Sequence, residues 1–397
     1  MKPDFLSPEF HNDPFPVLEW FRSNKPVYRH EETAVPCVSV FKYADVRYVC
    51  RNDNDFSFQG IANHDKPLVG GETLFRNPSV HTRMRELFDP LFNRKRIHWL
   101  DKVVREKSIE LLNNMEHGRS VNIVSDIADP LASFAMCKFL GLDHNDSKKA
   151  LHWAREVVQN EGYLYFRNSG YSDREERLDR VFKEVREYII DMIDSASHTG
   201  ENSALQYINN LHESNPRVVT REIFIDIVAI LSFAGVDTIS TVIGNLLRAL
   251  LENPGQFQRL AVDKNLLGPA IEETLRYYGC VKCMVRVATR NTALGHEEIN
   301  AGDTVLVWML SANRDGDIFE NPDRFDISRG ATQHFGFGTG IHQCIGAMLA
   351  RLVIKSFMTG LLENGYTMQP AGDDWLTPAQ TPLAYGSSEI HVTLAHR

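Results

Sequence analysis

The sequence FGTGIHQCIG at residues 337–346 runs directly into AMLAR at residues 347–351. Every second residue from 336 to 340 is glycine, and because glycine carries no Cβ atom, the backbone there can turn tightly and approach a flat ligand closely. Cys344 follows the glycines. The apolar residues after it recur with the spacing of one helix face: Ile345, Met348, Leu349, Leu352 and Val353. An amphipathic helix is therefore expected directly after the cysteine.

Cys344 is the residue in this stretch with the most distinctive chemistry. At the N-terminus of a helix, unpaired backbone N–H groups and the helix dipole stabilise a thiolate. A thiolate held at the end of a glycine loop is a suitable axial ligand for haem iron. The alternative is an ordinary buried cysteine beside a glycine turn. That alternative does not explain why Phe337, His342 and Gly346 occur at their particular spacings around Cys344.

The stretch resembles the haem-binding loop of cytochrome P450, the haem-thiolate monooxygenase family, in its soluble bacterial form. Other family landmarks occur in their usual order, so the resemblance extends over nearly the whole chain. It implies a mainly α fold with small β-sheets, a triangular helical prism with a long central helix over haem b. Because the landmarks must converge on one cofactor, residues 1–397 are expected to form a single domain. Cys344 would ligate the iron, and further haem contacts are expected from Ala234, Phe337 and Gly346.

The composition is that of a soluble globular chain, with 43% apolar residues and a mean hydropathy of −0.29. The net charge of −9 and the pI near 5.9 argue against nucleic acid and anionic membranes as partners. Residues 1–5 lack the apolar segment of a signal peptide. The six cysteines are dispersed, which indicates a reducing, cytoplasmic setting. Cys280-x-x-Cys283 has no second pair at metal-ligand spacing, so two packed thiols are favoured over a redox or zinc half-site.

Short alternating runs predict strands at 26–29 and 37–40, and helical patterns cover 43–50, 102–115 and 173–195.

One very long helix is predicted from an N-cap at Thr220 to Asn253, where Pro254 ends it. At 1.5 Å per residue such a helix would be about 50 Å long and would cross the whole molecule. It is apolar nearly all round from Ile223 to Val236, and it is therefore expected to be buried. The same run falls short of the roughly 20 apolar residues needed to span a bilayer.

The central helix contains AGVDT at residues 234–238. Gly235 costs about 1 kcal/mol against alanine in a helix interior, and Asp237 and Thr238 are poor choices in a buried one. Such violations are expected at functional sites. The small residues would leave room for dioxygen over the iron, and the Thr238 hydroxyl would bond backward and open the helix. A helix kink without chemistry is the alternative.

His81 and Arg85 are four residues apart and share a helix face, where they could simply be solvated. In the family, the pattern H-x-x-x-R at this place supplies charge-assisted hydrogen bonds to a haem propionate. The resemblance assigns the same role to Arg286, ten residues after Arg276, and to His342.

Glu273 and Arg276 are three residues apart and can pair on one helix face, as many solvated pairs do. In the family this E-x-x-R pair is buried and is joined by an arginine from a later P-x-R-F segment, here Arg324 in Pro322–Phe325. The resemblance therefore predicts a structural network on the cysteine-ligand side of the haem.

Long loops inside compact domains are usually functional. By resemblance, residues 56–80 cover the substrate pocket, with Phe56, Phe58, Ile61 and Leu68 as contacts. Aromatic residues between 159 and 172 fall where the family has a mobile lid; the alternative is that they are plain core or surface aromatics. Gly235 and Val281 complete the expected pocket lining.

The segment 279–285 departs from the family pattern, because Gly279-Cys280 stands where bacterial members usually have Ser-Pro. Its path is therefore open. Lys282 lies in this segment, and the hypothesis is that its ammonium pairs with a carboxylate on the substrate. The alternative is that Lys282 points outward to solvent.

The resemblance implies activation of dioxygen with two electrons from a separate redox partner. One oxygen atom enters a small hydrophobic substrate, by hydroxylation or a related oxidation of a carboxylated aromatic compound or a secondary metabolite. Thr238 would order oxygen and a water, and Asp237 would supply protons. No flavin or iron–sulfur motif is present, so electrons from NAD(P)H are expected through ferredoxin and its reductase, or flavodoxin. The chain is expected to be a monomer.

The basic residues Arg94, Lys95 and Arg96, with Arg83, could steer an acidic ferredoxin, or they could form a merely solvated patch.

Three alternative functions remain at this point. Oxidative coupling or dealkylation would use the same residues. A peroxide-driven peroxygenase would replace the Asp237-Thr238 pair with a residue that binds a substrate carboxylate. A haem-based sensor would normally need a partner or DNA-binding module, for which one fold filling 397 residues leaves no room.

Overall fold

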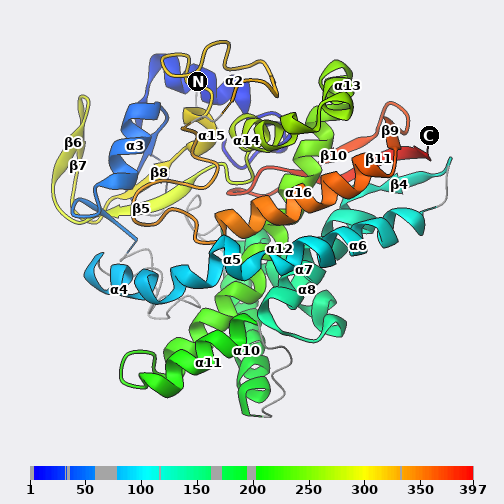
Figure 1. Ribbon diagram of the computed structural model, residues 1–397. Helices are drawn as coiled ribbons and strands as arrows, with labels where there is room; N and C mark the ends of the chain where they lie inside the picture. The colour runs from blue at the N-terminus through cyan, green and yellow to red at the C-terminus, as the bar shows by residue number, and fades with distance from the viewer. Residues whose placement is uncertain are drawn as a thin grey trace.

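The computed structural model describes residues 4–31, 33, 36–58, 78–115, 118–161, 172–194, 203–330 and 333–396. Helices dominate these residues, and small sheets lie on two sides of the helical body (Figure 1). The longer helices are α2 (Phe15–Asn24), α3 (Tyr43–Arg51), α4 (Pro78–Phe88), α6 (Trp99–Asn113), α7 (Asp129–Leu140), α8 (Ser147–Glu161), α10 (Ser172–Asp194), α11 (Ala204–Ser214), α12 (Arg221–Glu252), α13 (Pro254–Val262), α14 (Leu267–Tyr277) and α16 (Ala347–Glu363). Shorter helical segments are α1 (Pro8–Asn12), η1 (Asp89–Phe92), α5 (Arg94–Ile97), η2 (Ile123–Ala128), η3 (His144–Asp146), η4 (Lys264–Leu266) and α15 (Met309–Ala312).

The larger sheet has the strand order β1-β2-β8-β5-β3, in which β2 and β8 run parallel and the other neighbours are antiparallel. Its strands are β1 (Val27–His30), β2 (Cys37–Val40), β3 (Phe56–Ser57), β5 (Met284–Ala288) and β8 (Thr304–Val307). The second sheet forms around β11 (Ser387–His396), which pairs with β4 (Ser120–Asn122), β9 (Tyr366–Pro370) and β10 (Leu376–Pro378). Strands β6 (Thr292–Leu294) and β7 (Glu297–Ile299) form a separate hairpin.

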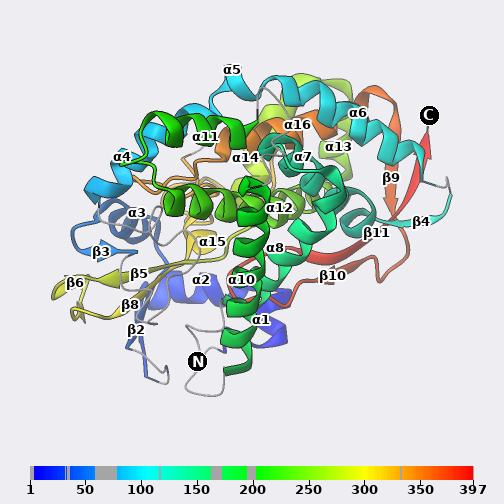
Figure 2. The ribbon, with the colours of Figure 1, turned by 90° about the horizontal axis from the view of Figure 1, so that it is seen from below.

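Helix α12 runs through the middle of the molecule, with other helices around it (Figures 1 and 2). The Thr220 hydroxyl caps it by accepting a hydrogen bond from the Ile223 N–H at 3.3 Å, and Pro254 begins the next helix, as predicted. By length and composition the whole of α12 could cross a membrane. The sequence analysis had judged only the apolar run from Ile223 to Val236, which is too short to do so. Its packing against α7, α8, α10 and α14 accounts for the apolar surface, as expected of a core helix.

The predicted strands and helices of the N-terminal region are confirmed as β1, β2 and α3, and the charged helix as α10. The helix after the cysteine is confirmed as α16, but it starts at Ala347 and its apolar stripe is narrower than predicted. Leu349 and Val353 are buried, whereas Met348 is 45% exposed because it lies off the face that packs on α6.

The segment after α14 turns at Gly279, whose φ of +58° favours glycine. The backbone then pairs with residues 381–385: the Lys282 N–H donates to the Leu383 carbonyl and the Tyr385 N–H donates to the Cys280 carbonyl. This pairing defines the path that the sequence left open. Cys280 and Cys283 are buried free thiols, as predicted.

Candidate active site

The cysteine loop is held by its own backbone. The Cys344 N–H donates to the Phe337 carbonyl at 2.9 Å, and the Gly338 N–H donates to the Phe335 carbonyl at 2.9 Å. Gly338 and Gly340 adopt φ angles of +67° and +79°, which side chains rarely tolerate. A Cβ on Gly340 would also collide with the Cys50 carbonyl oxygen. The alternating glycines therefore serve both conformation and close packing.

Cys344 differs from the other five cysteines, because it is exposed and they are buried. The surface of the residue is accessible, although neighbouring atoms desolvate the sulfur and raise the pKa of the thiol. The backbone N–H groups of Gly346 and Ala347, with Arg85 and Arg351, oppose this effect in part. The predicted stabilisation of the thiolate by the helix N-terminus is therefore present in the contacts with Gly346 and Ala347, but the desolvation of the sulfur is the larger effect on its pKa. A bound metal cation would reverse the balance, since coordinated thiols lose their proton.

Four cationic or ionisable side chains converge beside this loop. The rings of His81 and His342 lie 4.1 Å apart between centroids. Arg85 donates to the carbonyl of Gln343, next to the cysteine, at 2.6 Å. Arg286 is buried, and burial lowers its pKa. Burial also lowers the pKa of His342 to about 3, and the nearby His81, Arg286 and Arg85 lower it further.

Two buried nitrogens in this cluster have no hydrogen-bond partner among the described residues: Nδ1 of His81 and Nε of Arg286. The anions facing the cluster are Asp89, paired with Arg85, and Asp53, whose Oδ1 lies 3.5 Å from Nε2 of His342. An unpaired buried donor on a cation such as Arg286 is costly. The cluster therefore suits an anionic ligand, and the two propionates of haem fit it.

Helix α12 and the cysteine loop meet at one place. A crevice of about 20 Å³ is lined by residues of α4, η1, α12 and the loop: His81, Met84, Arg85, Phe88, Phe92, Ile227, Ile230, Leu231 and Ile345. The fold therefore brings together three segments that the sequence analysis had assigned to one cofactor. Together with the exposed thiol, this arrangement fits a haem between α12 and the loop.

The AGVDT segment lies in an unbroken part of α12. The Thr238 hydroxyl donates to the Ala234 carbonyl at 2.9 Å, as predicted, but the helix does not open. Ala234 is exposed in an otherwise largely buried helix, which leaves space beside it. Gly235 is placed differently from the prediction: a Cβ there would meet the Met136 side chain of α7, so this glycine permits helix packing.

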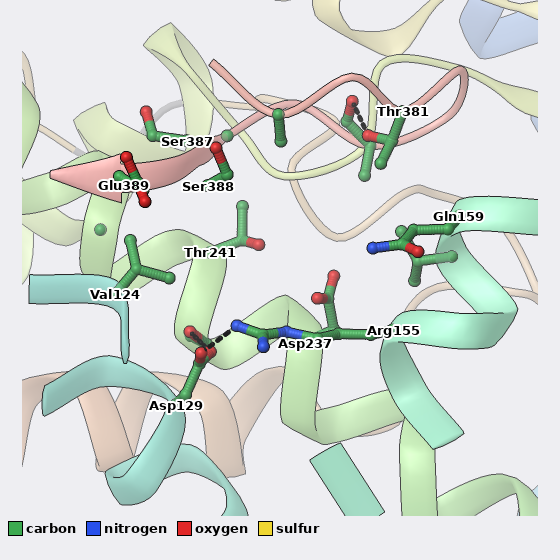
Figure 3. Close-up of a pocket in the computed structure, with 16 residues that line it drawn as sticks. Val124, Asp129, Arg155, Gln159, Asp237, Thr241, Thr381, Ser387, Ser388 and Glu389 are labelled. Atoms are coloured by element: carbon green, nitrogen blue, oxygen red, sulfur yellow. Dashed lines mark hydrogen bonds and ion pairs between the residues drawn. The ribbon is translucent and has the colours of Figure 1, made fainter. Parts of the chain in front are cut away.

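Asp237 points into a polar cavity between α12, α8 and the start of β11 (Figure 3). Burial raises its pKa to about 6; the charge of Asp129 raises the pKa further, and that of Arg155 lowers it. A carboxyl group with a pKa near neutrality can both hold and release a proton.

The E-x-x-R network is buried, as predicted, but its third member is Arg329 rather than Arg324. Arg276 donates to both carboxylate oxygens of Glu273 at 2.8 and 2.9 Å, and Arg329 adds a contact at 3.1 Å. Arg324 is exposed and contributes its backbone carbonyl only. The sequence signal for Arg329 was its position shortly after Phe325-Asp326, in the turn that faces α14.

Lys282 does not serve as a substrate anchor. Its side chain is buried, and its ammonium donates to the Thr381 carbonyl at 2.7 Å and lies 3.0 Å from Nδ1 of His11. The hypothesis of a carboxylate partner on the substrate is therefore wrong, and so is the alternative of an outward-facing side chain.

Of the other expected pocket residues, Phe58 lies under the Arg286 guanidinium at 3.5 Å and edge-on to His342, beside the cationic cluster. Val281 forms an isolated bridge with Ala384, and Phe56 is buried in β3. Ile61, Leu68 and the aromatic segment from 163 to 171 lie outside the described residues.

Phe337 lies under the guanidinium of Arg351 at 4.4 Å. Arg351 is held in turn by Glu272 of α14, at 2.6 and 2.8 Å, and Glu272 also contacts His334. The sequence analysis gave neither Glu272 nor Arg351 a role, because pairs between distant segments leave no spacing signal.

Comparisons with known proteins agree with this site. The sequence model of the cytochrome P450 family matches residues 6–393. Cytochrome P450 109 of Bacillus spizizenii is 29% identical over 391 residues, 97% of this chain and 92% of the relative. The cyclomarin C epoxidase CymV of Salinispora arenicola is 26% identical over 386 residues, 96% of this chain and 95% of the relative. The crystal structure of CYP109E1 from Bacillus megaterium in complex with testosterone has a TM-score of 0.88 at 27% identity, covering 98% of this chain and 99% of that one.

Fold and site thus define a haem-thiolate enzyme. The chain belongs to the cytochrome P450 family, and it is a monooxygenase-type oxidoreductase.

Proposed function

We propose that this P450 inserts one atom of dioxygen into a small hydrophobic organic substrate, with electrons from a separate redox partner. The observation that carries the proposal is the exposed Cys344 beside a cluster in which buried nitrogens of His81 and Arg286 lack partners among the described residues. The thiol would ligate the iron of haem b, and the cluster of His81, Arg85, Arg286 and His342 would hold the propionates. When bound, a thiolate-ligated haem supplies the chemistry that activates dioxygen.

The protein's own contribution on α12 is positioning and protons. The space beside Ala234 would admit dioxygen, and the Thr238 hydroxyl would orient it together with a water. Asp237 would hold a proton and release it toward Thr238, one residue further along the helix. Phe337 and Gly346 would pack against the haem from the loop.

For the substrate, the assignment of Lys282 to an internal contact removes the reason for expecting a carboxylate. A neutral apolar substrate is favoured, such as a secondary metabolite. The relatives support this choice, because one is an epoxidase of cyclomarin C and one solved structure contains testosterone. Hydroxylation is the expected outcome, and dealkylation, epoxidation or oxidative coupling would use the same residues.

Electrons from NAD(P)H would arrive through ferredoxin and its reductase, or flavodoxin, and the chain would act as a cytoplasmic monomer of one domain. Arg83, Arg94 and Lys95 are exposed and available to an acidic partner. Arg96 is less available, because its guanidinium stacks on Tyr207 at 4.5 Å.

The test is an optical titration of the purified ferric protein with neutral apolar compounds and with matched carboxylic acids. We expect a thiolate-haem spectrum that shifts to high spin with neutral compounds and shows no preference for the acids. In Cys344→Ala the thiolate spectrum is lost. An unchanged spectrum in that variant, or a chain that binds no haem, contradicts the proposal.

A further inference from the structure

Helix α1 is docked on the body of the protein by aromatic packing and by a buried polar contact. The rings of Phe5 and Phe10 lie 4.8 and 5.7 Å from that of Trp308, between centroids. His11, the next residue of α1, is 2% exposed, and Lys282 is completely buried. Nδ1 of His11 lies 3.0 Å from Nζ of Lys282. The contact thus joins α1 to a segment 271 residues further along the chain.

Lys282 also holds the turn formed by residues 379–385. Its ammonium donates to the Thr381 carbonyl at 2.7 Å, and its backbone N–H donates to the Leu383 carbonyl at 2.6 Å. Thr381 lines the cavity into which Asp237 points. One lysine therefore connects α1 with a wall of that cavity.

The surroundings of this ammonium are neutral. Its hydrogen-bonding partners are the His11 imidazole and the Thr381 carbonyl, and the rings of Phe10 and Tyr385 lie 5.7 and 6.0 Å from Nζ. Among the described residues no carboxylate forms an ion pair with it. A buried cation without a counter-ion is costly, and the neutral form of the amine is favoured.

The Lys282–His11 contact has room for one positive charge only. When Lys282 is an ammonium, it donates to Nδ1, so the imidazole carries its proton on Nε2, which is buried and has no partner among the described residues. When Lys282 is an amine, it can accept a proton from Nδ1–H instead. If both groups were protonated, two cationic donors would face each other without an acceptor between them.

We propose that the Lys282–His11 contact makes the docking of α1 sensitive to acid. As pH falls, proton uptake favours a locally opened state in which α1 leaves Lys282 and both side chains meet water. One proton from solvent is bound at Lys282 on opening and, at lower pH, a second at His11. The docked state binds fewer protons than the opened state, so its stability decreases as pH falls.

The two groups act in separate ranges of pH. Burial lowers the pKa of Lys282 from 10.5 to about 7, so Lys282 weakens the docking between these values. Burial and then the charge of Lys282 lower the pKa of His11 from 6.5 to about 4, which gives a second range at lower pH. Within each range, uptake of one proton changes the opening constant about tenfold per pH unit.

The other titratable groups near the contact do not reverse this direction. The charge of Asp4 favours the protonated His11 and therefore opposes only part of the effect of burial. Cys283 and Tyr385 face Lys282, but burial raises the pKa of both, so they stay neutral up to pH 9. Helix α15, whose backbone donates to the Lys282 carbonyl, has no titratable side chain.

The experiment is amide hydrogen exchange of the haem-loaded protein at pH 7, 8 and 9, followed by mass spectrometry and corrected for the intrinsic exchange rate at each pH. The protection of residues 4–13 should fall about tenfold per pH unit from pH 9 to pH 7. The peptide over α2 is the internal reference. The dependence should vanish in Lys282→Met and persist in Lys25→Met, an exposed lysine at the end of α2.

Protection of residues 4–13 that is constant from pH 9 to pH 7, or that changes equally in α2, overturns the inference. So does a pH dependence that survives in Lys282→Met. If that variant does not fold, His11→Phe decides, because it should abolish the further loss of protection between pH 6.5 and pH 5 and retain the loss between pH 9 and pH 7. Retention of the loss at low pH in His11→Phe contradicts the assignment.

Discussion

Two clusters of buried charge in this protein differ in how completely they are paired. Around Glu273, Arg276 donates to two carboxylate oxygens and to the carbonyls of Asn313, Pro322 and Arg324, and Arg329 completes the set. Around Cys344, His81 and Arg286 are just as buried, yet each has a nitrogen with no partner among the described residues. The first cluster is complete within the chain, whereas the second needs an external anion.

The comparison gives a physical criterion for separating structural from ligand-binding charges. A buried ion contributes to folding only when its hydrogen-bonding capacity is filled. When that capacity is not filled, a ligand that binds to the ion offsets the free-energy cost of burying it. The cavity at Asp237 is an intermediate case, because solvent reaches it.

The largest effect is expected from breaking the complete cluster. Glu273→Gln leaves the Arg276 guanidinium buried without a counter-ion, and the free energy of unfolding should fall by about 3–5 kcal/mol. Chemical denaturation measures this loss. The control is Glu272→Gln, one residue away, where the lost contact is with the half-buried Arg351. This variant should lower the free energy of unfolding by only about 1–3 kcal/mol. Equal losses in the two variants would contradict the assignment of Glu273 as the structural centre.

Lys282 provides a third kind of buried charge, paired with neutral groups only. Burial lowers its pKa from 10.5 to about 7. Between these values the unfolded chain binds a proton that the folded chain has released, so stability should rise with pH. The expected slope between pH 7 and pH 9 is on the order of 1 kcal/mol per pH unit.

Denaturation curves at pH 7, 8 and 9 measure this slope, which should vanish in Lys282→Met and persist in Lys355→Met, an exposed lysine on α16. A wild-type stability that is flat or falling over this range would mean that Lys282 keeps its proton in the folded state.

The incomplete cluster should respond in the opposite way to the complete one. Arg286→Met removes a buried cation whose Nε lacks a partner among the described residues and which has no ion pair there, so the unfolding free energy of the haem-free protein should change little. Haem retention should weaken about 10- to 100-fold, the loss expected for charge-assisted hydrogen bonds. The rate of haem transfer to an excess of apomyoglobin measures it. Arg290→Met, an exposed neighbour paired with Asp55, should retain haem normally.

The smallest effect is expected at solvated charges. Arg94→Gln with Lys95→Gln should reduce the rate of electron transfer from an acidic ferredoxin a few-fold at low salt, because rim charges mainly affect association. The difference from wild type should disappear at high ionic strength. Stopped-flow reduction measures both. A deficit that persists in high salt would point to a contact other than charge steering.

Local sequence patterns predicted much of the fold. The cap at Thr220 and Pro254 gave the limits of α12, because both act through the adjacent backbone. The glycines of the cysteine loop were predictable for the same reason, since positive φ is a property of single residues. The resemblance supplied His81, Arg85, Arg286 and His342, which the fold brings to one place.

What only the tertiary structure decided concerns side chains whose partners lie far away in sequence. Arg329 rather than Arg324 reaches Glu273, and Lys282 points to His11 rather than to a substrate. Asp129 acts on Asp237 from 108 residues away, through a cavity that no spacing reveals. Sequence by itself determined the backbone conformations and the types of residue available, because these depend on near neighbours. The pairing and protonation of buried charges depend on which distant segments enclose them, and only the packed chain defines that.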